Sequence, residues 1–253
     1  MEIAIVTGAS SGLGREYVRA VADKLPNLDE IWIVARRKER LIELAQSIPG
    51  RRFRILPYDL TDPDSFRKLH GLLAREKPHV HLLINDAGYL CNGPLTEVPI
   101  EKQRQMVALN AVAPMALVNT VLPYVHRGDT MINVSSVGGF SPSPNMVVYG
   151  ATKSFLSFYT KGLHAELRHR GIHVLALEPG NMHTALYNGG DSDNDKKSIV
   201  GLLPFLDLPQ VTRRSLTFAQ WGWMVYTPRM FYKAYRVLAA LVPDAVLSYF
   251  IQV

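Results

Sequence analysis

Short apolar runs alternate with longer amphipathic segments along most of the chain. The apolar runs are rich in Ile, Val and Leu, and most are followed within a few residues by Gly, Pro, Asn or Asp, which is typical of buried strands. Strands are expected at Glu2–Val6, Ile31–Val34, Phe53–Pro57, His81–Ile84, Thr130–Ser135, His173–Glu178 and Trp223–Tyr226. Helices are expected at Arg15–Leu25, Lys102–Val125, Val147–Arg170 and Gln210–Ala219. The alternation predicts an α/β fold of the Rossmann type, a doubly wound parallel sheet of about seven strands whose ligand lies beyond the carboxyl ends of the strands.

The first expected strand leads directly into a glycine-rich turn, Thr7-Gly8-Ala9-Ser10-Ser11-Gly12-Leu13-Gly14. Glycines at such a turn let the backbone approach a pyrophosphate, and the helix that follows presents free N–H groups and a partial positive charge. The spacing is TGxxxGxG rather than GxGxxG. Its position between a strand and a helix favours a nucleotide-binding turn over an ordinary loop.

Tyr149 and Lys153 stand four residues apart, and Ser136 lies thirteen positions before the tyrosine. On a helix, side chains four apart project from one face. A free phenol has a pKa of about 10, and a nearby cation favours the phenolate, so Lys153 is expected to lower the pKa of Tyr149. The tyrosine could then exchange a proton with a carbonyl or alcohol oxygen held by Ser136. Such a pair alone is usually two solvated neighbours, and the glycine turn is the independent support for a catalytic role.

Together these motifs resemble the short-chain dehydrogenase/reductase superfamily in its compact single-domain branch, from Ile3 to about Thr184. The resemblance implies hydride transfer between a nicotinamide cofactor and a carbonyl or alcohol carbon. Its catalytic residues would be Ser136, Tyr149, Lys153 and Asn110, of which Asn110 would hold a water against the lysine. It also implies one nucleotide-binding domain over residues 1–253, with a substrate loop at about 181–200.

The resemblance further implies which residues hold the cofactor. Asp59 would contact the adenine, and Asn85-Asp86-Ala87-Gly88 would line the groove in place of the family's NNAG. The expected set is Gly8, Ser10, Ser11, Gly12, Leu13, Gly14, Arg36, Asp59, Leu60, Asn85, Ala87, Gly88, Tyr149, Lys153, Pro179, Gly180, Met182 and Thr184. Two positions depart from the family pattern: Asp86 replaces an Asn, and Met182 stands where Val is common. Asp86 is interpreted as a solvated or hydrogen-bonded carboxylate rather than a charge acting on the cofactor.

The end of the second expected strand favours NADP(H) over NAD(H). An NAD enzyme of this type would carry a carboxylate near Ala35 that binds the ribose hydroxyls, whereas an NADP enzyme would carry a cation that binds the 2′-phosphate. Arg36 follows instead, and its guanidinium suits a bidentate phosphate contact. The alternative, a merely charged helix start in Arg36, Arg37, Lys38 and Arg40, is disfavoured because cations oppose the dipole at a helix N-terminus.

Composition narrows the possible partners. The net charge is +6, from 28 Lys and Arg against 22 Asp and Glu, but the basic residues are scattered, so no nucleic-acid partner is expected. One cysteine, Cys91, excludes an intrachain disulfide. The eight histidines show no metal-ligand spacing, and no metal is predicted. With no signal peptide or apolar run of membrane-spanning length, a cytoplasmic enzyme is expected.

The C-terminal lobe, residues 198–253, is apolar and aromatic and departs most from the family. Met230–Leu241 has helical apolar spacing with interspersed cations. Three interpretations stay open for this lobe: core and dimer surface, a lid over a large apolar substrate, or a helix in peripheral contact with a membrane. The stretch Val225–Arg236 is similar to tails of bacterial 3-oxoacyl and hydroxysteroid reductases.

These observations predict an oxidoreductase that interconverts a hydrophobic ketone and a secondary alcohol. One rival is a non-catalytic NADP-binding regulator or scaffold on the same fold. Another is an epimerase or dehydratase of the extended branch, against which the glycine spacing and the short chain argue. A homo-dimer or homo-tetramer is expected, with the helices Lys102–Val125 and Val147–Arg170 at its interface by analogy with the family.

Overall fold

The computed structural model describes residues 1–182 and 204–250. Seven parallel strands form one sheet in the order β3-β2-β1-β4-β5-β6-β7. The strands are β1 (Glu2–Thr7), β2 (Glu30–Val34), β3 (Phe53–Leu56), β4 (His79–Asn85), β5 (Thr130–Val134), β6 (His173–Leu177) and β7 (Val225–Tyr226). The strand order reverses between β1 and β4, which opens a crevice at the carboxyl ends of the strands. The predicted Rossmann-type sheet is confirmed.

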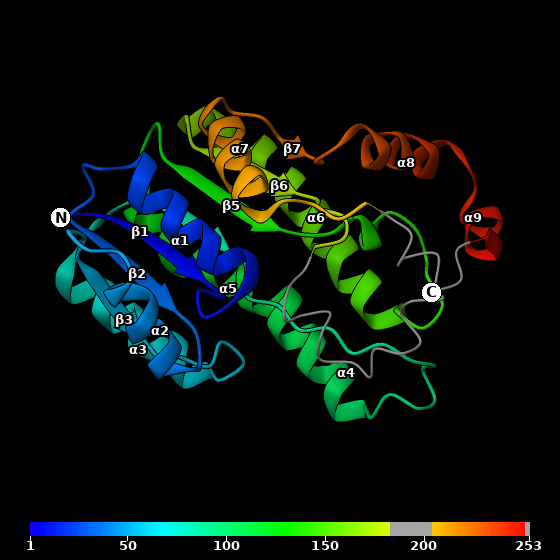
Figure 1. Ribbon diagram of the computed structural model, residues 1–253, viewed down its shortest axis with the longest axis horizontal. Coiled ribbons are helices and arrows are strands. Elements are labelled where there is room, and N and C mark those ends of the chain that lie inside the picture. The colour runs from blue at the N-terminus through cyan, green and yellow to red at the C-terminus, as the bar shows by residue number, and fades with distance from the viewer. Residues whose placement is uncertain (183–203, 251–253) are drawn as a thin grey trace.

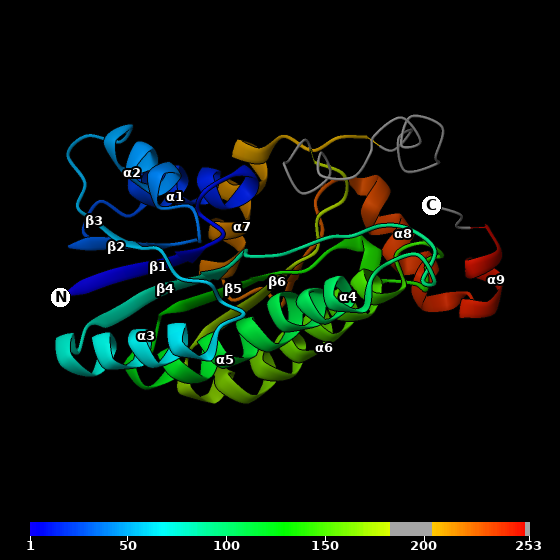
Figure 2. The same cartoon turned by 90° about the horizontal axis from the view of Figure 1, so that it is seen from below.

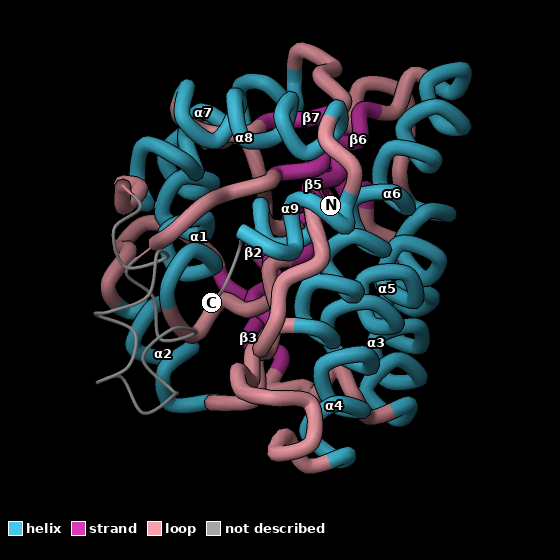
Figure 3. The backbone as a smooth tube through the Cα atoms, turned by 90° about the vertical axis from the view of Figure 1, so that its right-hand side faces the viewer, coloured by secondary structure: helices cyan, strands magenta, loops and turns pink. Residues whose placement is uncertain are grey.

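Helices cover both faces of this sheet, as Figures 2 and 3 show. The helices are α1 (Gly12–Lys24), α2 (Lys38–Gln46), α3 (Pro63–Glu76), α4 (Ile100–Val107), α5 (Ala113–Val121), α6 (Val147–Leu167), α7 (Leu208–Gln220), α8 (Met230–Leu241) and α9 (Asp244–Phe250). One layer holds α1, α2 and α7, and the opposite layer holds α3 to α6. Two apolar clusters fill the spaces between these layers and the sheet.

Local signals fix where two of the helices begin. Asp62 accepts a hydrogen bond from the N–H of Asp64 at 2.9 Å and caps α3, whose first residue is a proline. Asp207 caps α7 in the same way through the N–H of Gln210. Both are N-caps followed by an early proline, a common helix start.

The long expected helix Lys102–Val125 is one helical stretch, but it is not uniform. A π-helical turn, Ala108–Val112, joins α4 to α5, and a 3-10 turn, Leu122–Tyr124, ends the stretch. By length and composition Ile100–Tyr124 could cross a membrane. Here it is a helix of the sheet-covering layer, because Leu117, Val118 and Val121 lie in the core against the sheet.

The helices α8 and α9 lie beyond the carboxyl ends of the strands, at the end of the molecule opposite the N-terminus (Figures 1 and 2). Tyr232 anchors α8 there. It is fully buried, its hydroxyl donates to the carbonyl of Pro204 at 2.9 Å, and it accepts from the N–H of Asn181 at 3.1 Å. The start of the C-terminal lobe is therefore attached to the chain that leaves β6.

Candidate active site

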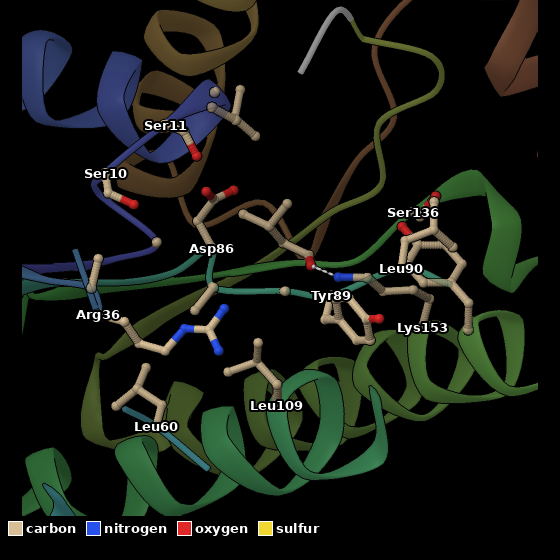
Figure 4. A pocket seen from close by; sticks show the side chains of 18 of the residues that line it. Ser10, Ser11, Arg36, Leu60, Asp86, Tyr89, Leu90, Leu109, Ser136 and Lys153 are labelled. Atoms are coloured by element: carbon tan, nitrogen blue, oxygen red, sulfur yellow. Dashed lines mark hydrogen bonds between the residues drawn. The ribbon is translucent and has the colours of Figure 1, made fainter. Parts of the chain in front are cut away.

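A cavity of about 590 Å³ opens at the carboxyl ends of the central strands (Figure 4). It lies at the switch between β1 and β4, where a doubly wound sheet binds its ligand. Most of the predicted site residues line it: Gly8, Ser10, Ser11, Gly12, Leu13, Arg36, Asp59, Leu60, Ala87, Gly88, Ser136, Tyr149, Lys153, Pro179, Gly180 and Met182. Segments far apart in the sequence thus form one site.

Two glycines of the turn, Gly8 and Gly14, have no room for a side chain. Gly8 has a φ of +71°, and a Cβ there would stand 2.9 Å from the N atom of Ala87. A Cβ on Gly14 would overlap the carbonyl of Gly8. Gly14 therefore allows α1 to pack closely against the turn, and it does not line the cavity. Side chains at these glycines would fill the space under the N-terminus of α1. Without them, this space fits the pyrophosphate of a dinucleotide.

Ser136, Tyr149 and Lys153 meet on one wall of the cavity. Ser136 follows β5, and the other two lie one turn apart on α6, as the spacing predicts. Tyr149 is hydrogen-bonded to Ser136, and the Lys153 ammonium donates to the carbonyl of Val134 at 2.8 Å. The lysine lies 5.7 Å from the centroid of the tyrosine ring. The three side chains therefore form one polar constellation.

The pKa of Tyr149 does not follow the sequence expectation. Burial raises it to about 12, while the hydrogen bond with Ser136 acts in the lowering direction. The expected lowering by Lys153 is absent because the ammonium is turned toward Val134 and the phenol is desolvated. In this form the tyrosine holds its proton at neutral pH and is a proton donor.

Lys153 and Asp86 lie close enough for each to shift the pKa of the other. Burial lowers the pKa of Lys153 to about 8, and the Asp86 carboxylate opposes that shift. Burial also raises the pKa of Asp86 to about 8, opposed by Lys153 and by a hydrogen bond from the N–H of Gly14. The hydrogen-bonded alternative expected for Asp86 is therefore present, but this carboxyl also lies within the nucleotide cavity.

Asn110 lies behind the cavity wall rather than on it. It is fully buried in the π-helical turn, accepts from the N–H of Tyr89 and donates to the carbonyl of Tyr89, both at 2.8 Å. Its amide also lies 3.2 Å from the hydroxyl of Thr152. A Cβ built on Gly88 would stand 3.5 Å from Asn110 and 3.7 Å from the Lys153 ammonium, so the two side chains flank the same glycine.

Two arginines face the cavity at the end of β2. Arg36 is exposed and lies 3.9 Å from the carboxylate of Asp59. Arg37, which the sequence interpretation did not select, donates to the hydroxyls of Ser10 and Ser11 at 2.9 and 3.1 Å. Asp59 is itself held by Thr61, whose N–H and hydroxyl lie 2.9 and 2.7 Å from its carboxylate.

Asn85 lies off the cavity, contrary to the expectation. Its amide donates to the side chain of Asn133 on β5 at 2.8 Å, so it links two strands instead of lining the groove. Thr184 falls outside the described residues. Sequence reasoning missed Arg37, Tyr58, Tyr89, Leu90, Cys91, Asn92, Lys102 and Leu109, which also line the cavity. Several of these continue the Asn85–Gly88 motif, and that continuation could have identified them.

Residues 2–195 match the family model described as short chain dehydrogenase. The chain belongs to the short-chain dehydrogenase family. This confirms the resemblance, and with it a dehydrogenase or reductase that depends on a nicotinamide cofactor.

Oxidoreductases and dehydrogenases of several bacteria are similar to this chain. An uncharacterised oxidoreductase of Staphylococcus epidermidis is 30% identical over 199 residues, which cover 78% of this chain and 84% of that protein. A short-chain dehydrogenase from Sphingobium yanoikuyae, solved in complex with NADPH, has 27% identity and a TM-score of 0.79, covering 97% and 98% of the two chains. A bulky-bulky ketone specific alcohol dehydrogenase from Comamonas testosteroni has 26% identity and a TM-score of 0.74, covering 97% and 96%.

Proposed function

We propose that this short-chain dehydrogenase interconverts a hydrophobic ketone and its secondary alcohol, with NADP(H) as the preferred cofactor. The observation that carries the proposal is the convergence of Ser136, Tyr149 and Lys153 on one wall of the nucleotide cavity. The similar structure from Sphingobium yanoikuyae, solved with NADPH, supports the choice of cofactor. The bulky-ketone enzyme from Comamonas testosteroni supports the class of substrate.

Bound in this cavity, NADP(H) would supply or accept the hydride at the carbonyl carbon. Ser136 holds the carbonyl oxygen, and Tyr149 donates its proton to that oxygen during reduction. The raised pKa of Tyr149 keeps this proton in place at neutral pH. Lys153 would then pass a proton to the phenolate, and Asn110 would hold a water that relays a proton from solvent to the lysine. In the oxidative direction Tyr149 must first lose its proton, so oxidation gains from alkaline pH.

Two cations at the end of β2 support the preference for NADP(H). Arg36 and Arg37 both line the cavity beside Ser10 and Ser11 of the nucleotide turn. A guanidinium binds phosphate through two parallel hydrogen bonds, which suits a 2′-phosphate at this position.

The test is oxidation of NADPH and of NADH, followed at the absorbance of the reduced nicotinamide, with steroid ketones, 3-oxoacyl thioesters and aromatic ketones. We expect turnover with NADPH on at least one of these classes. Tyr149→Phe should lower turnover by about 100- to 10,000-fold while NADPH affinity stays within several-fold, because only the proton donor is removed. Loss of both would argue against this role of the tyrosine, and tight NADPH binding without any turnover would favour the regulator alternative.

A further inference from the structure

Four titratable side chains meet at the amino-terminal edge of the sheet. Glu2 begins β1, His79 and His81 lie at the start of β4, and Asp129 directly precedes β5. Because β4 lies between β1 and β5, the three strand starts are neighbours. This edge carries the N-terminus and lies opposite the end of the molecule that holds α8 and α9 (Figures 1 and 2). The cluster is therefore separate from the catalytic cavity.

A β-bulge places the second histidine. Glu2 pairs with His79 and Ile3 with Val80, but Ala4 pairs with Leu82, so His81 is left without a partner in β1. A bulge of this kind re-aims the side chain of the extra residue. The two imidazole rings lie with their centroids 4.2 Å apart, and both contact Glu2 and Asp129.

Asp129 decides which nitrogen of each imidazole carries the hydrogen. Its side chain is 2% exposed, and its carboxylate accepts from the backbone N–H of His126 at 2.6 Å. The same carboxylate lies 2.7 Å from Nε2 of His79 and 2.8 Å from Nδ1 of His81, in hydrogen-bond geometry. An ionised carboxylate only accepts, so these two nitrogens donate. In the neutral rings the lone pairs then lie on Nδ1 of His79 and on Nε2 of His81.

Both lone-pair nitrogens lie against one oxygen of Glu2. Oε2 is 2.8 Å from Nδ1 of His79 and 2.6 Å from Nε2 of His81. This oxygen is buried, and in the described part of the chain it has no partner in hydrogen-bond geometry. With both rings neutral, three electron-pair donors converge without a hydrogen bond between them, and a shared cation would satisfy all three.

We propose that Glu2, His79 and His81 bind a divalent transition-metal ion of the zinc type, while Asp129 holds both imidazoles in the ligating orientation. Imidazole and carboxylate are ligands of Zn²⁺, and a ligating histidine usually donates its other N–H to a carboxylate. A tetrahedral ion with bonds of about 2.0–2.2 Å separates its ligand atoms by about 3.3–3.6 Å, so these contacts would open by about 0.5–1 Å. This proposal departs from the expectation of no metal, and its ligands come from two neighbouring strands.

Room for a fourth ligand lies next to this group. Glu2 and His81 line a cavity of about 320 Å³, which is large enough for a water molecule on the ion. His79, His126 and Asp129 form a second possible group, with the rings of His79 and His126 4.5 Å apart. Ligation there through Nε2 of His79 would break its hydrogen bond to Asp129, so the geometry favours the site at Glu2.

The test uses the full chain with any purification tag removed and with bound metal stripped by a chelator. Isothermal titration with ZnCl₂ should show one ion per chain, and the ion should raise the unfolding temperature. Glu2→Gln and His81→Ala should abolish this binding, and Asp129→Asn should weaken it by about 10- to 100-fold. His126→Ala is the matched control and should leave Zn²⁺ affinity unchanged.

Two checks keep the outcome interpretable. His81 is 44% exposed, so the metal-free His81→Ala variant should unfold at the same temperature as the metal-free natural protein. Turnover of ketone should also be unchanged in this variant, since the site lies at the far edge of the sheet. Failure of the stripped protein to bind Zn²⁺ would overturn the proposal. Binding that survives Glu2→Gln and His81→Ala, or that is lost in His126→Ala, would overturn it equally.

Discussion

At the residue scale, Asp86 places a carboxyl group directly beneath the nucleotide turn. Its Oδ2 atom would stand 3.0 Å from a Cβ on Gly8, and it accepts from the N–H of Gly14. Burial raises the pKa of this carboxyl to about 8. An acid with a raised pKa is neutral below that value and charged above it. Asp86 is therefore tolerated beside a pyrophosphate at neutral pH but repels it at alkaline pH.

This predicts a pH-dependent affinity for NADPH. Between pH 7 and pH 9 the natural protein should bind NADPH progressively more weakly, and Asp86→Asn should bind it several-fold more tightly than the natural protein at pH 9. Fluorescence titrations of NADPH across this range give the comparison. Asp59→Asn is the control, since the pKa of Asp59 is lowered and that group stays charged throughout. Parallel affinity profiles for Asp86→Asn and the natural protein would contradict the prediction.

A second prediction separates the two arginines at the end of β2. A hydrogen bond to a charged group contributes about 1.5–3 kcal/mol, so Arg36→Ala should weaken NADPH binding about 10- to 100-fold and leave NADH binding nearly unchanged. Arg37→Ala should weaken both cofactors, because it also frees the hydroxyls of Ser10 and Ser11 at the nucleotide turn. Dissociation constants for both cofactors, with Lys38→Ala as the control, would test this. Equal losses of NADH affinity in the two arginine variants would contradict it.

The sequence predicts many site residues because they follow strand ends, and strand ends are visible in the apolar pattern. Gly8, Ser136 and Gly180 were found in this way, and all three line the cavity. The pKa of Tyr149 could not be predicted, since desolvation depends on which elements cover the phenol. Asn85 was misplaced for a related reason: its motif identifies the loop but not the direction in which each side chain points.

At the element scale, the anchoring of α8 depends on the absence of a side chain at Gly180. A Cβ on Gly180 would overlap the ring of Tyr232, which is fully buried and hydrogen-bonded to Asn181 and to Pro204. Alanine at this position must displace either the tyrosine or the turn after β6. The turn also lines the nucleotide cavity, so the displacement would reach the active site.

We therefore expect Gly180→Ala to lower the free energy of unfolding by about 1–3 kcal/mol, the usual cost of overpacking. Gly162→Ala is a matched control, because Gly162 lies inside α6 and a Cβ there would meet nothing within 4 Å. That change should instead stabilise the protein by about 0.5–1 kcal/mol. Chemical denaturation of both variants provides the measurement. A Gly180→Ala variant as stable as the natural protein would contradict the proposed role of Tyr232.

Elements with a strong periodic pattern were predicted most closely. The helix α8 has the bounds Met230–Leu241 that its apolar spacing predicts. The expected strand Trp223–Tyr226 is shorter, Val225–Tyr226, because the N–H of Trp223 donates to Phe218 in the turn that ends α7. The strand β4 begins earlier than expected, at His79, whose N–H pairs with the carbonyl of Met1. Such ends depend on hydrogen-bond partners from distant segments.

At the scale of the whole molecule, two surfaces expose large apolar side chains. On α6, Phe158 is 80% exposed, and Phe155 on the same helix is exposed as well. On α8, Met230 and Leu241 are 75% and 78% exposed. Exposed apolar side chains gathered on one helix are characteristic of interaction sites. The first surface belongs to the helices expected at an interface between subunits, and the second belongs to the lobe for which dimer, lid and membrane roles stay open.

The two surfaces can be separated by charge substitution. If α6 forms the interface of a homo-dimer or homo-tetramer, Phe158→Asp should shift the protein to a smaller species in light scattering coupled to size exclusion. A charge at the centre of an interface must be desolvated on association, whereas on the free surface it stays in water, so folding should be unaffected. Leu241→Asp on α8 should leave the assembly intact. Dissociation by Leu241→Asp but not by Phe158→Asp would contradict this prediction. A second copy would then cover α8, and the C-terminal lobe would be the interface.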